Sequence, residues 1–370
     1  MIWGLIAVCG LAFCYQVVAI LAMLRHLSRR DPSASRMPGI SILKPVRGLD
    51  PGFCDAIRSH ALQRYPDFEI LFGAADAQDP AATQIRRLQA EFPNLAIRLI
   101  HATTAAPNGK VGVLIDLAAK ARHDILLVND SDIRVPEGYL QDVAAPLEDV
   151  NVGLVTCLYH ASSTGLPGIW EALGIATDFA PSTLVAPFVG VKEFGLGSTL
   201  LFRREDLDAI GGFHAIADHI ADDYQLAKRI TQLGKRVHLS TVVVETNLRG
   251  DSWKGVWDHQ VRWHRTIRVS RGAYVGLPVT MATVWALAAA CAGLWWTAAG
   301  LLAIRMTMAL CAGGGVLRSP LVARWWWLVP LRDLWGAAVW GVGLFGSTVQ
   351  WRDQELKLND DGRIMGVQLS

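Results

Sequence analysis

The sequence predicts an α/β domain with a mostly parallel sheet, joined to apolar segments near both ends of the chain. From residue 40 onward, short apolar runs alternate about every 15 residues with helix-like stretches, which is typical of βαβ units. The 370 residues are 52% hydrophobic, more than a soluble domain of this length needs. The excess lies in residues 2–24 and after residue 274, so the part between, about 39–271, has ordinary globular composition.

The first half of this domain contains four short apolar runs that end at turn residues. We expect strands at 40–43, 68–73, 96–100 and 125–128. Helices are expected between them at 55–62, 83–92 and 111–121. No G-x-G-x-x-G follows the first strand, so a standard dinucleotide-binding fold is not indicated.

The second half is less regular. A strand is expected at 152–158, and residues 165–194 are rich in small and apolar residues without a clear period. A glycine-containing turn then leads into a strand at 199–202. Asp222 and Asp223 open a helix that Gly234 ends, and a last strand is expected at 237–244.

The apolar segments predict a membrane protein. Residues 1–24 are long enough to cross roughly 30 Å of hydrocarbon as an anchor, with a cleaved signal peptide as the alternative. Basic residues follow at once, so the positive-inside rule places residues 39–250 in the cytoplasm. Residues 251–273 interleave tryptophans with cations, as an amphipathic interfacial segment does. We expect a multi-pass protein of the bacterial inner membrane.

The C-terminal membrane region, 274–351, leaves two topologies open. Residues 274–317 are about two spans long, and Arg332 and Asp333 interrupt the next apolar stretch. We expect these two side chains to form an ion pair at the interface. Either a further span places the tail, 352–370, outside, or an interfacial stretch with a short hairpin leaves the tail inside.

Charge and cysteine content exclude some classes of function. The net charge of +2 gives no nucleic-acid footprint. Six scattered cysteines without a C-x-x-C motif indicate neither a disulfide framework nor a zinc site.

Acidic residues mark the candidate site. Asp130 and Asp132 directly follow a buried strand, at the sheet edge where ligands of open α/β sheets bind. Two carboxylates one residue apart can share Mg²⁺ or Mn²⁺ and leave coordination positions for substrate phosphates. An Asp-rich turn is the structural alternative. Further carboxylates follow the second strand and open the late helix, and together these residue types suit a nucleotide-sugar site.

Six short motifs, occurring in this order along the chain, resemble those of a known enzyme family. They are Lys44-Pro45-Val46-Arg47-Gly48, Asp79-Pro80-Ala81, Asn108-Gly109-Lys110-Val111, Asp130-Ser131-Asp132-Ile133-Arg134-Val135, Ala221-Asp222-Asp223-Tyr224 and Arg262-Trp263. With them the chain resembles a family 2/21 glycosyltransferase of the ceramide glucosyltransferase type, including bacterial relatives associated with hopanoid glycosylation. The resemblance covers most of the chain from the first span to residue 271. It implies a GT-A domain at 39–250 and an inverting single displacement on a UDP-sugar.

The resemblance also implies roles for individual residues. Asp223 matches the family base, while Asp130 and Asp132 match the metal-binding carboxylates. The residues implied to bind the nucleotide-sugar are Pro45, Asp76, Asp79, Lys110, Asp130, Arg262 and Trp263. The chain departs from the family pattern in two places. His259 stands where the family usually has Gln or Arg, and Gly112 and Val113 replace asparagines that often follow the lysine.

The function that follows from the resemblance is transfer of a hexose from a UDP-sugar to a lipid hydroxyl, with a divalent cation as cofactor. Glucose and ceramide are one donor and acceptor pair, and N-acetylglucosamine with a hopanoid polyol is the alternative. Membrane lipids are expected as partners, and nucleic acid is not. A non-catalytic lipid-binding membrane protein is the alternative from another class.

Overall fold

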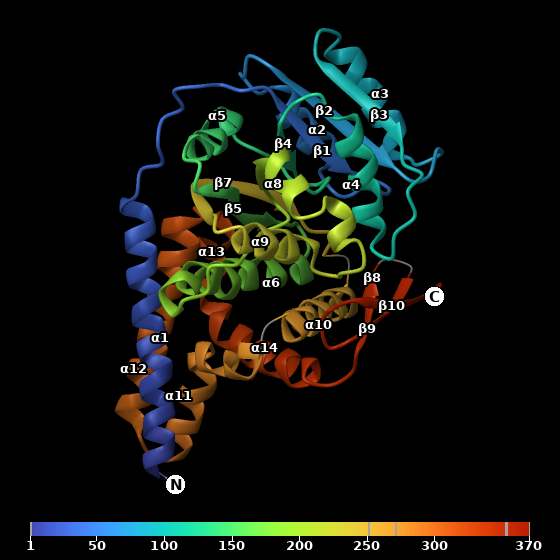
Figure 1. Cartoon of the computed structure of the whole chain (residues 1–370). Helices are drawn as coiled ribbons and strands as arrows, with labels where there is room; N and C mark the ends of the chain where they lie inside the picture. The colour runs from blue at the N-terminus through green and yellow to red at the C-terminus, as the bar shows by residue number, and fades with distance from the viewer. Residues whose placement is uncertain (1, 251, 271, 352–353, 370) are drawn as a thin grey trace.

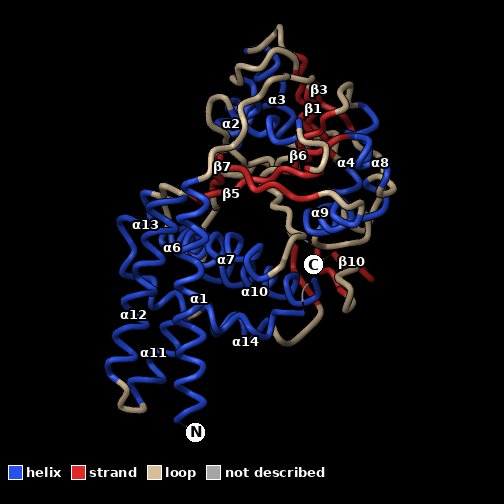
Figure 2. Tube along the Cα trace, turned by 60° about the vertical axis from the view of Figure 1, so that its left-hand side comes forward, coloured by secondary structure: helices blue, strands red, loops and turns tan. Residues whose placement is uncertain are grey.

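The computed structural model describes residues 2–250, 252–270, 272–351 and 354–369. Of the expected boundaries, residues 1, 251, 352 and 370 lie outside the described residues. Figure 1 shows a sheet with its helices above a layer of helices, and α1 (Ile2–Ser28) running down one side. Figure 2 shows that strands are concentrated in the upper part and near the C-terminus, while the lower part is helical.

A seven-stranded sheet forms the centre of the domain, in the order β3-β2-β1-β4-β6-β5-β7. The strands are β1 (Ile40–Pro45), β2 (Phe68–Ala74), β3 (Ala96–His101), β4 (Ile125–Val128), β5 (Val152–Ser162), β6 (Leu200–Arg203) and β7 (Arg236–Asn247). Only β6 runs antiparallel to its neighbours, so the expected mostly parallel sheet is confirmed. Leu43 pairs with Val128, and the loops after β1 and β4 therefore leave the same edge.

Helices cover both faces of this sheet. They are α2 (Phe53–Ala61), α3 (Ala81–Glu91), α4 (Gly109–Lys120), α5 (Tyr139–Ala144), α8 (Arg204–Ala209) and α9 (Asp222–Gln232). Successive residues of β1 serve opposite cores: Ile42 packs with Phe53 of α2, and Leu43 packs with Leu114 of α4. Strands buried on both faces become continuous apolar runs, which explains why their positions could be read from the sequence.

Residues 165–194, expected to be irregular, are mostly helical. The chain forms α6 (Leu166–Gly174), a π-helix (Ile175–Phe179), α7 (Ala180–Val185) and a 3₁₀ turn (Ala186–Val189). Pro181 has no N–H for the carbonyl of Thr177, four residues earlier. Arg305 donates to that carbonyl instead, at 3.1 Å. The wider π turn and an outside donor thus let the helix continue past its proline.

The lower layer contains α10 (Trp253–Ser270), α11 (Ala282–Cys291), α12 (Trp295–Leu310), α13 (Pro320–Trp325) and α14 (Val329–Gly343). Three helical stretches are long and apolar enough to cross a membrane: Ile2–Ser28, Leu166–Val189 and Trp295–Val316, with the bent pair Tyr274–Thr280 and Ala282–Cys291 as a further candidate. Leu166–Val189 is 67% buried inside the protein and packs under the sheet. By contrast, α1, α11 and α12 extend side by side away from the sheet (Figure 1).

Buried ions join these helices. Arg305 of α12 is 1% exposed and donates to Asp333 of α14 at 2.7 Å and to Asp178 of the π-helix at 2.6 Å. Arg332 donates to Asp178 at 3.2 Å and to Gln260 of α10 at 3.1 Å. The expected pair between Arg332 and Asp333 is therefore wrong, because neighbouring residues on a helix point apart and each meets a different partner.

A second, three-stranded antiparallel sheet follows α14: β8 (Thr348–Trp351), β9 (Gln354–Leu358) and β10 (Ile364–Leu369). It packs against the segment just before α9. Ile220 donates its N–H to the carbonyl of Gly362 at 3.0 Å, and Ile364 donates to the carbonyl of Asp218 at 2.7 Å. The segment that ends at Asp222 is therefore held by the C-terminal sheet.

Candidate active site

The loop after β4 is fixed from behind by buried polar groups. The Asn129 side chain donates to the carbonyl of Ser198, and the fully buried Lys44 ammonium donates to the carbonyl of Asp130 at 3.1 Å. Burial lowers the pKa of Lys44 to about 7, although Asp132 and Asp130 oppose the shift. Lys44 therefore supports the loop backbone, and its ammonium does not face the open edge of the sheet.

One lysine gathers the carboxylates. The Lys110 ammonium lies 2.9 Å from Oδ1 of Asp130 and 3.1 Å from Oδ2 of Asp222. Burial opposes ionisation of Lys110, but the two carboxylates raise its pKa, so the ammonium stays charged. Lys110 stands at the start of α4, where the side chain of Asn108 accepts from the N–H groups of Lys110 and Val111. Three segments distant in sequence therefore meet at one charge cluster.

Asp223 is the most perturbed carboxylate of this cluster. Its Oδ2 accepts the N–H of Gly197 at 3.1 Å. Burial and the neighbouring Asp222 raise the pKa of Asp223 to about 6, against the lowering effect of Lys110. A carboxylate with a pKa close to neutral can exchange a proton with a substrate at physiological pH.

Asp222 stands at the start of α9, where an aspartate often caps the helix, but its carboxylate pairs with Lys110. It is the first residue of α9, but a side-chain hydrogen bond at this end of the helix is made by Asp223, which accepts the N–H of Tyr224 at 2.7 Å. The Asp222 carboxylate faces Lys110 instead. Asp222 therefore belongs to the site rather than to the helix cap.

Asp132 lies on the other side of Asp130. The Thr246 hydroxyl donates to its Oδ2, and Ser131 between the two aspartates donates to Asp50 at 2.9 Å. Burial and the charge of Asp130 raise the pKa of Asp132 to about 6. A carboxylate whose charge is destabilised by a neighbouring aspartate in this way suits a site for a divalent cation.

The two aspartates after β4 are the candidate ligands of the implied divalent cation. No group of three or more His, Cys, Asp or Glu side chains with metal-binding geometry occurs among the residues that the structure describes. Mg²⁺ and Mn²⁺ sites in enzymes that act on phosphates need only one or two carboxylates, because substrate oxygens and water complete the coordination. Asp130, which is 43% exposed, and Asp132 fit such a partial site.

Three of the residues implied to bind the nucleotide-sugar, Pro45, Asp76 and Asp79, lie around the ends of β1 and β2. Asp79 is buried, and its carboxylate accepts from Gly48 at 2.7 Å and from Ala81 at 2.8 Å. It thereby joins the loop after β1, which begins beside Pro45, to the start of α3. Asp76 is exposed and accepts from Gln78 within its own turn. The structure gives Asp79 the more constrained position of the two.

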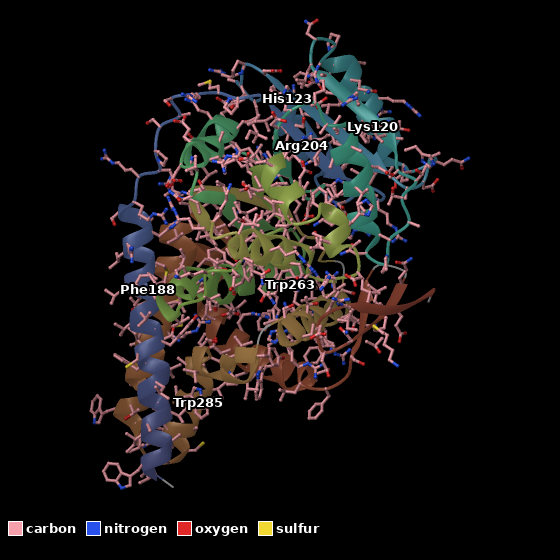
Figure 3. All side chains as sticks on the ribbon, viewed as in Figure 1. Lys120, His123, Phe188, Arg204, Trp263 and Trp285 are labelled. Atoms are coloured by element: carbon pink, nitrogen blue, oxygen red, sulfur yellow. The ribbon has the colours of Figure 1, made fainter. Side chains whose placement is uncertain are left out.

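The Arg262-Trp263 motif lies on α10. The Trp263 ring lies 4.6 Å from His259 and 6.2 Å from Phe179, which in turn lies 5.6 Å from Tyr159 of β5. Figure 3 labels Trp263 between the sheet and the lower helices. An aromatic series thus connects the motif to the sheet, and Arg262 is partly exposed on the same turn of the helix.

His259, which departs from the family pattern, pairs its Nδ1 with Oε1 of the buried Glu171 on α6. Sequence reasoning did not single out Glu171, because an acidic residue in an apolar stretch has no local motif. Gly197 was also missed, although its N–H and its lack of a side chain are both used at the site: a Cβ there would lie 2.9 Å from Oδ2 of Asp130.

The sheet order and the carboxylate-lined edge define a GT-A fold, as found in glycosyltransferases. The mannosyltransferase PcManGT from Pyrobaculum calidifontis, solved with GDP-Man and Mn²⁺, has this fold at a TM-score of 0.55. The match covers 92% of this chain and 96% of that one at 19% identity, so it shows the fold alone.

A model of glycosyl transferase family 21 matches residues 4–364, and the chain belongs to that family of transferases. Ceramide glucosyltransferase 1 of Caenorhabditis elegans is 27% identical over 234 residues, 62% of this chain and 48% of the relative. Ceramide glucosyltransferase 3 of the same organism is 25% identical over 271 residues, 70% and 58% of the two chains. This chain therefore spans about half the length of the curated relatives it matches. The resemblance inferred from the motifs is confirmed.

Proposed function

We propose that this glycosyltransferase transfers glucose from UDP-glucose to the primary hydroxyl of ceramide at a membrane surface. Membership of family 21 and the two ceramide glucosyltransferase relatives support the donor and acceptor. The observation that carries the proposal is the half-buried Asp223 carboxylate in the charge cluster of Lys110, with its pKa raised to about 6.

In the proposed reaction, the acceptor oxygen attacks the anomeric carbon while the bond from that carbon to the diphosphate breaks. Asp223 takes the hydroxyl proton, and UDP leaves with the electron pair of the broken bond. The N–H of Gly197 holds Asp223 in place by donating to Oδ2. Single displacement inverts the anomeric configuration.

The donor is proposed to lie along the open edge of the sheet. The loops joined by Asp79 hold the nucleoside end, and Lys110 balances charge beside the diphosphate. A divalent cation held by Asp130 and Asp132 would supply further neutralisation of the diphosphate. Arg262 and Trp263 are proposed to close the site from the membrane side.

The membrane placement is part of the same proposal. We propose that α1, α11 and α12 cross the bilayer, and that α10 and α14, which pack together beneath the sheet, lie along its surface (Figure 1). The basic residues at the end of α1 support a cytoplasmic sheet domain. The C-terminal sheet, packed against residues 218–221, would then lie on the same side.

The test uses purified protein in detergent with Mn²⁺, offered UDP-glucose or UDP-N-acetylglucosamine with ceramide or a hopanoid polyol, and lipid products identified by mass. Glucosylceramide is the expected product. Asp223→Asn should lower kcat at least about 100-fold, because a general base contributes 10²–10⁴. Asp208→Asn, an exposed aspartate on α8, is the matched control.

Two results would overturn the proposal. A product only from UDP-N-acetylglucosamine and the hopanoid would replace the donor and acceptor. Equal turnover of the Asp223→Asn and Asp208→Asn variants would remove Asp223 from the role of base.

A further inference from the structure

A cavity of about 650 Å³ lies at the end of α1 nearest the sheet domain. Its walls are the last turns of α1, the segment around Ala186–Val189 and the turn that joins α9 to β7. Asp223 stands at the start of α9, and the cavity lies at the other end of that helix, about 13 Å away at 1.5 Å per residue. The cavity is therefore separate from the carboxylate cluster.

The walls are rich in cations. The basic lining residues are Arg25, Arg29, Lys192, Lys235 and Arg236. Glu193 is the one acidic side chain among the described residues that line the cavity. The cavity therefore has an excess of positive charge.

Two of these cations are neutralised outside the cavity. Lys235 forms an ion pair with Asp206, and Arg236 pairs with Asp149 at 2.6 Å. Their charges are balanced, so they do not define the ligand.

Two of the remaining cations are not balanced in this way, whereas Arg29 forms an ion pair with Asp31 at 3.8 Å. Arg25 lies over the ring of Phe188, 5.4 Å from its centroid. The ion pairs of the described residues include neither Arg25 nor Lys192. These two side chains leave positive charge available for an anion.

A buried polar side chain also lines the cavity. His26 lines it and is 5% exposed, yet within the described residues its Nδ1 has no hydrogen-bond partner. A buried ring nitrogen without a partner costs free energy, which a ligand oxygen or hydroxyl inside the cavity would recover. This observation is independent of the surrounding cations.

The apolar surroundings indicate what kind of anion fits. Phe188 and Val191 line the cavity, and the neighbouring Val189 is 67% exposed. Figure 3 shows Phe188, itself 46% exposed, beside α1. Large apolar side chains next to unbalanced cations at the end of a spanning helix match a lipid with an anionic head group.

We propose that this cavity binds an anionic phospholipid, with its phosphate and head group held by Arg25 and Lys192 and its acyl chains along Phe188 and Val189. The inference depends on α1 spanning the membrane and on nothing about donor or acceptor.

The test reconstitutes the full chain in nanodiscs of phosphatidylcholine with or without one fifth phosphatidylglycerol. Lipid that stays bound after mild detergent extraction is identified by native mass spectrometry. Wild type is expected to retain phosphatidylglycerol in preference to phosphatidylcholine. Each basic residue near an anionic lipid contributes about fivefold in binding, so Arg25→Gln with Lys192→Gln should bind phosphatidylglycerol about 25-fold more weakly.

The matched control is Arg30→Gln with Lys120→Gln, which removes two exposed cations outside the cavity. It should retain phosphatidylglycerol as wild type does. If the double variant does not fold, Lys192→Gln alone, on a surface loop, should weaken binding about fivefold.

Equal retention of both lipids by wild type would overturn the site, and so would an equal loss in the control pair. Inorganic phosphate that displaces phosphatidylglycerol at millimolar concentration would show a soluble anion site and overturn the lipid assignment. Each readout is lipid binding, so failure here is distinguishable from failure of the proposed transfer reaction.

Discussion

Replacing Lys110 by Met should move the pH dependence of the enzyme. Lys110 carries the one charge in the cluster that lowers the pKa of Asp223, while burial, Asp222 and Asp130 raise it. Without the ammonium, Asp223 binds its proton more tightly. As a base it is active only when deprotonated, so the acid limb of kcat/KM must move to higher pH.

Coulomb's law gives the order of magnitude of this shift. Two charges at an assumed separation of about 6 Å interact by about 3 kcal/mol at an effective dielectric constant near 20, which corresponds to about 2 pKa units. Water reaches the cluster at Asp130, which is 43% exposed, and screens part of this interaction. We therefore expect the acid limb to move up by about one pH unit, from about 6 to about 7.

The assay is kcat/KM for the donor between pH 5 and 9 at saturating Mn²⁺. Saturation matters because protons also compete with a cation for Asp132, whose pKa is likewise raised to about 6. Lys110→Arg keeps the charge and should keep the wild-type limb. Lys120→Met, at the exposed far end of α4, is the control for loss of one lysine.

An acid limb that stays near pH 6 in Lys110→Met, in a folded variant, would falsify the electrostatic link between Lys110 and Asp223. A fall in rate without a shift would leave Lys110 as a donor-binding residue alone.

Three further predictions concern supporting residues. Gly197→Ala should lower kcat/KM at least about tenfold with little change in unfolding temperature, because the added Cβ would crowd the Asp130 carboxylate. The control is Gly109→Ala, which should stay active because no atom lies within 4 Å of a Cβ there. Asp79→Ala should lower the free energy of unfolding by about 2 kcal/mol in denaturant titrations, because it removes two hydrogen bonds to the backbone. Replacing the exposed Asp76 by Ala should lower this free energy by less than about 0.5 kcal/mol. Equal losses would show that Asp79 is not structural. Leu356→Asp should detach the C-terminal sheet and lower kcat, since Leu356 is 1% exposed in its core; unchanged turnover would contradict a supporting role for that sheet.

The strands of the first half could be predicted because they are buried on both faces of the sheet. Such strands consist of consecutive apolar residues, which are visible in the sequence. The run 125–128 matches β4 residue for residue. The position of Asp130 and Asp132 follows from that strand alone, since a residue after a parallel strand must lie at the sheet edge.

The contacts that complete the site could not be predicted in this way. Lys110 and Asp222 are brought together by the packing of α4 and α9, and neither sequence motif refers to the other. The helix 166–189 was missed because Pro181 normally ends a helix, and its continuation depends on Arg305, more than a hundred residues away. Local pattern carries no information about such distant donors.

The bonds between residues 218–220 and 362–364 also set an order of events during synthesis. About 146 residues separate Asp218 from Ile364, which at 5–20 residues per second takes the ribosome roughly 7 to 30 seconds. In that interval α11 and α12 are synthesised and, in the membrane placement proposed above, enter the bilayer. We expect the segment before Asp222 to stay unsupported until then, so that a nascent chain gains full activity only once its membrane helices are in place.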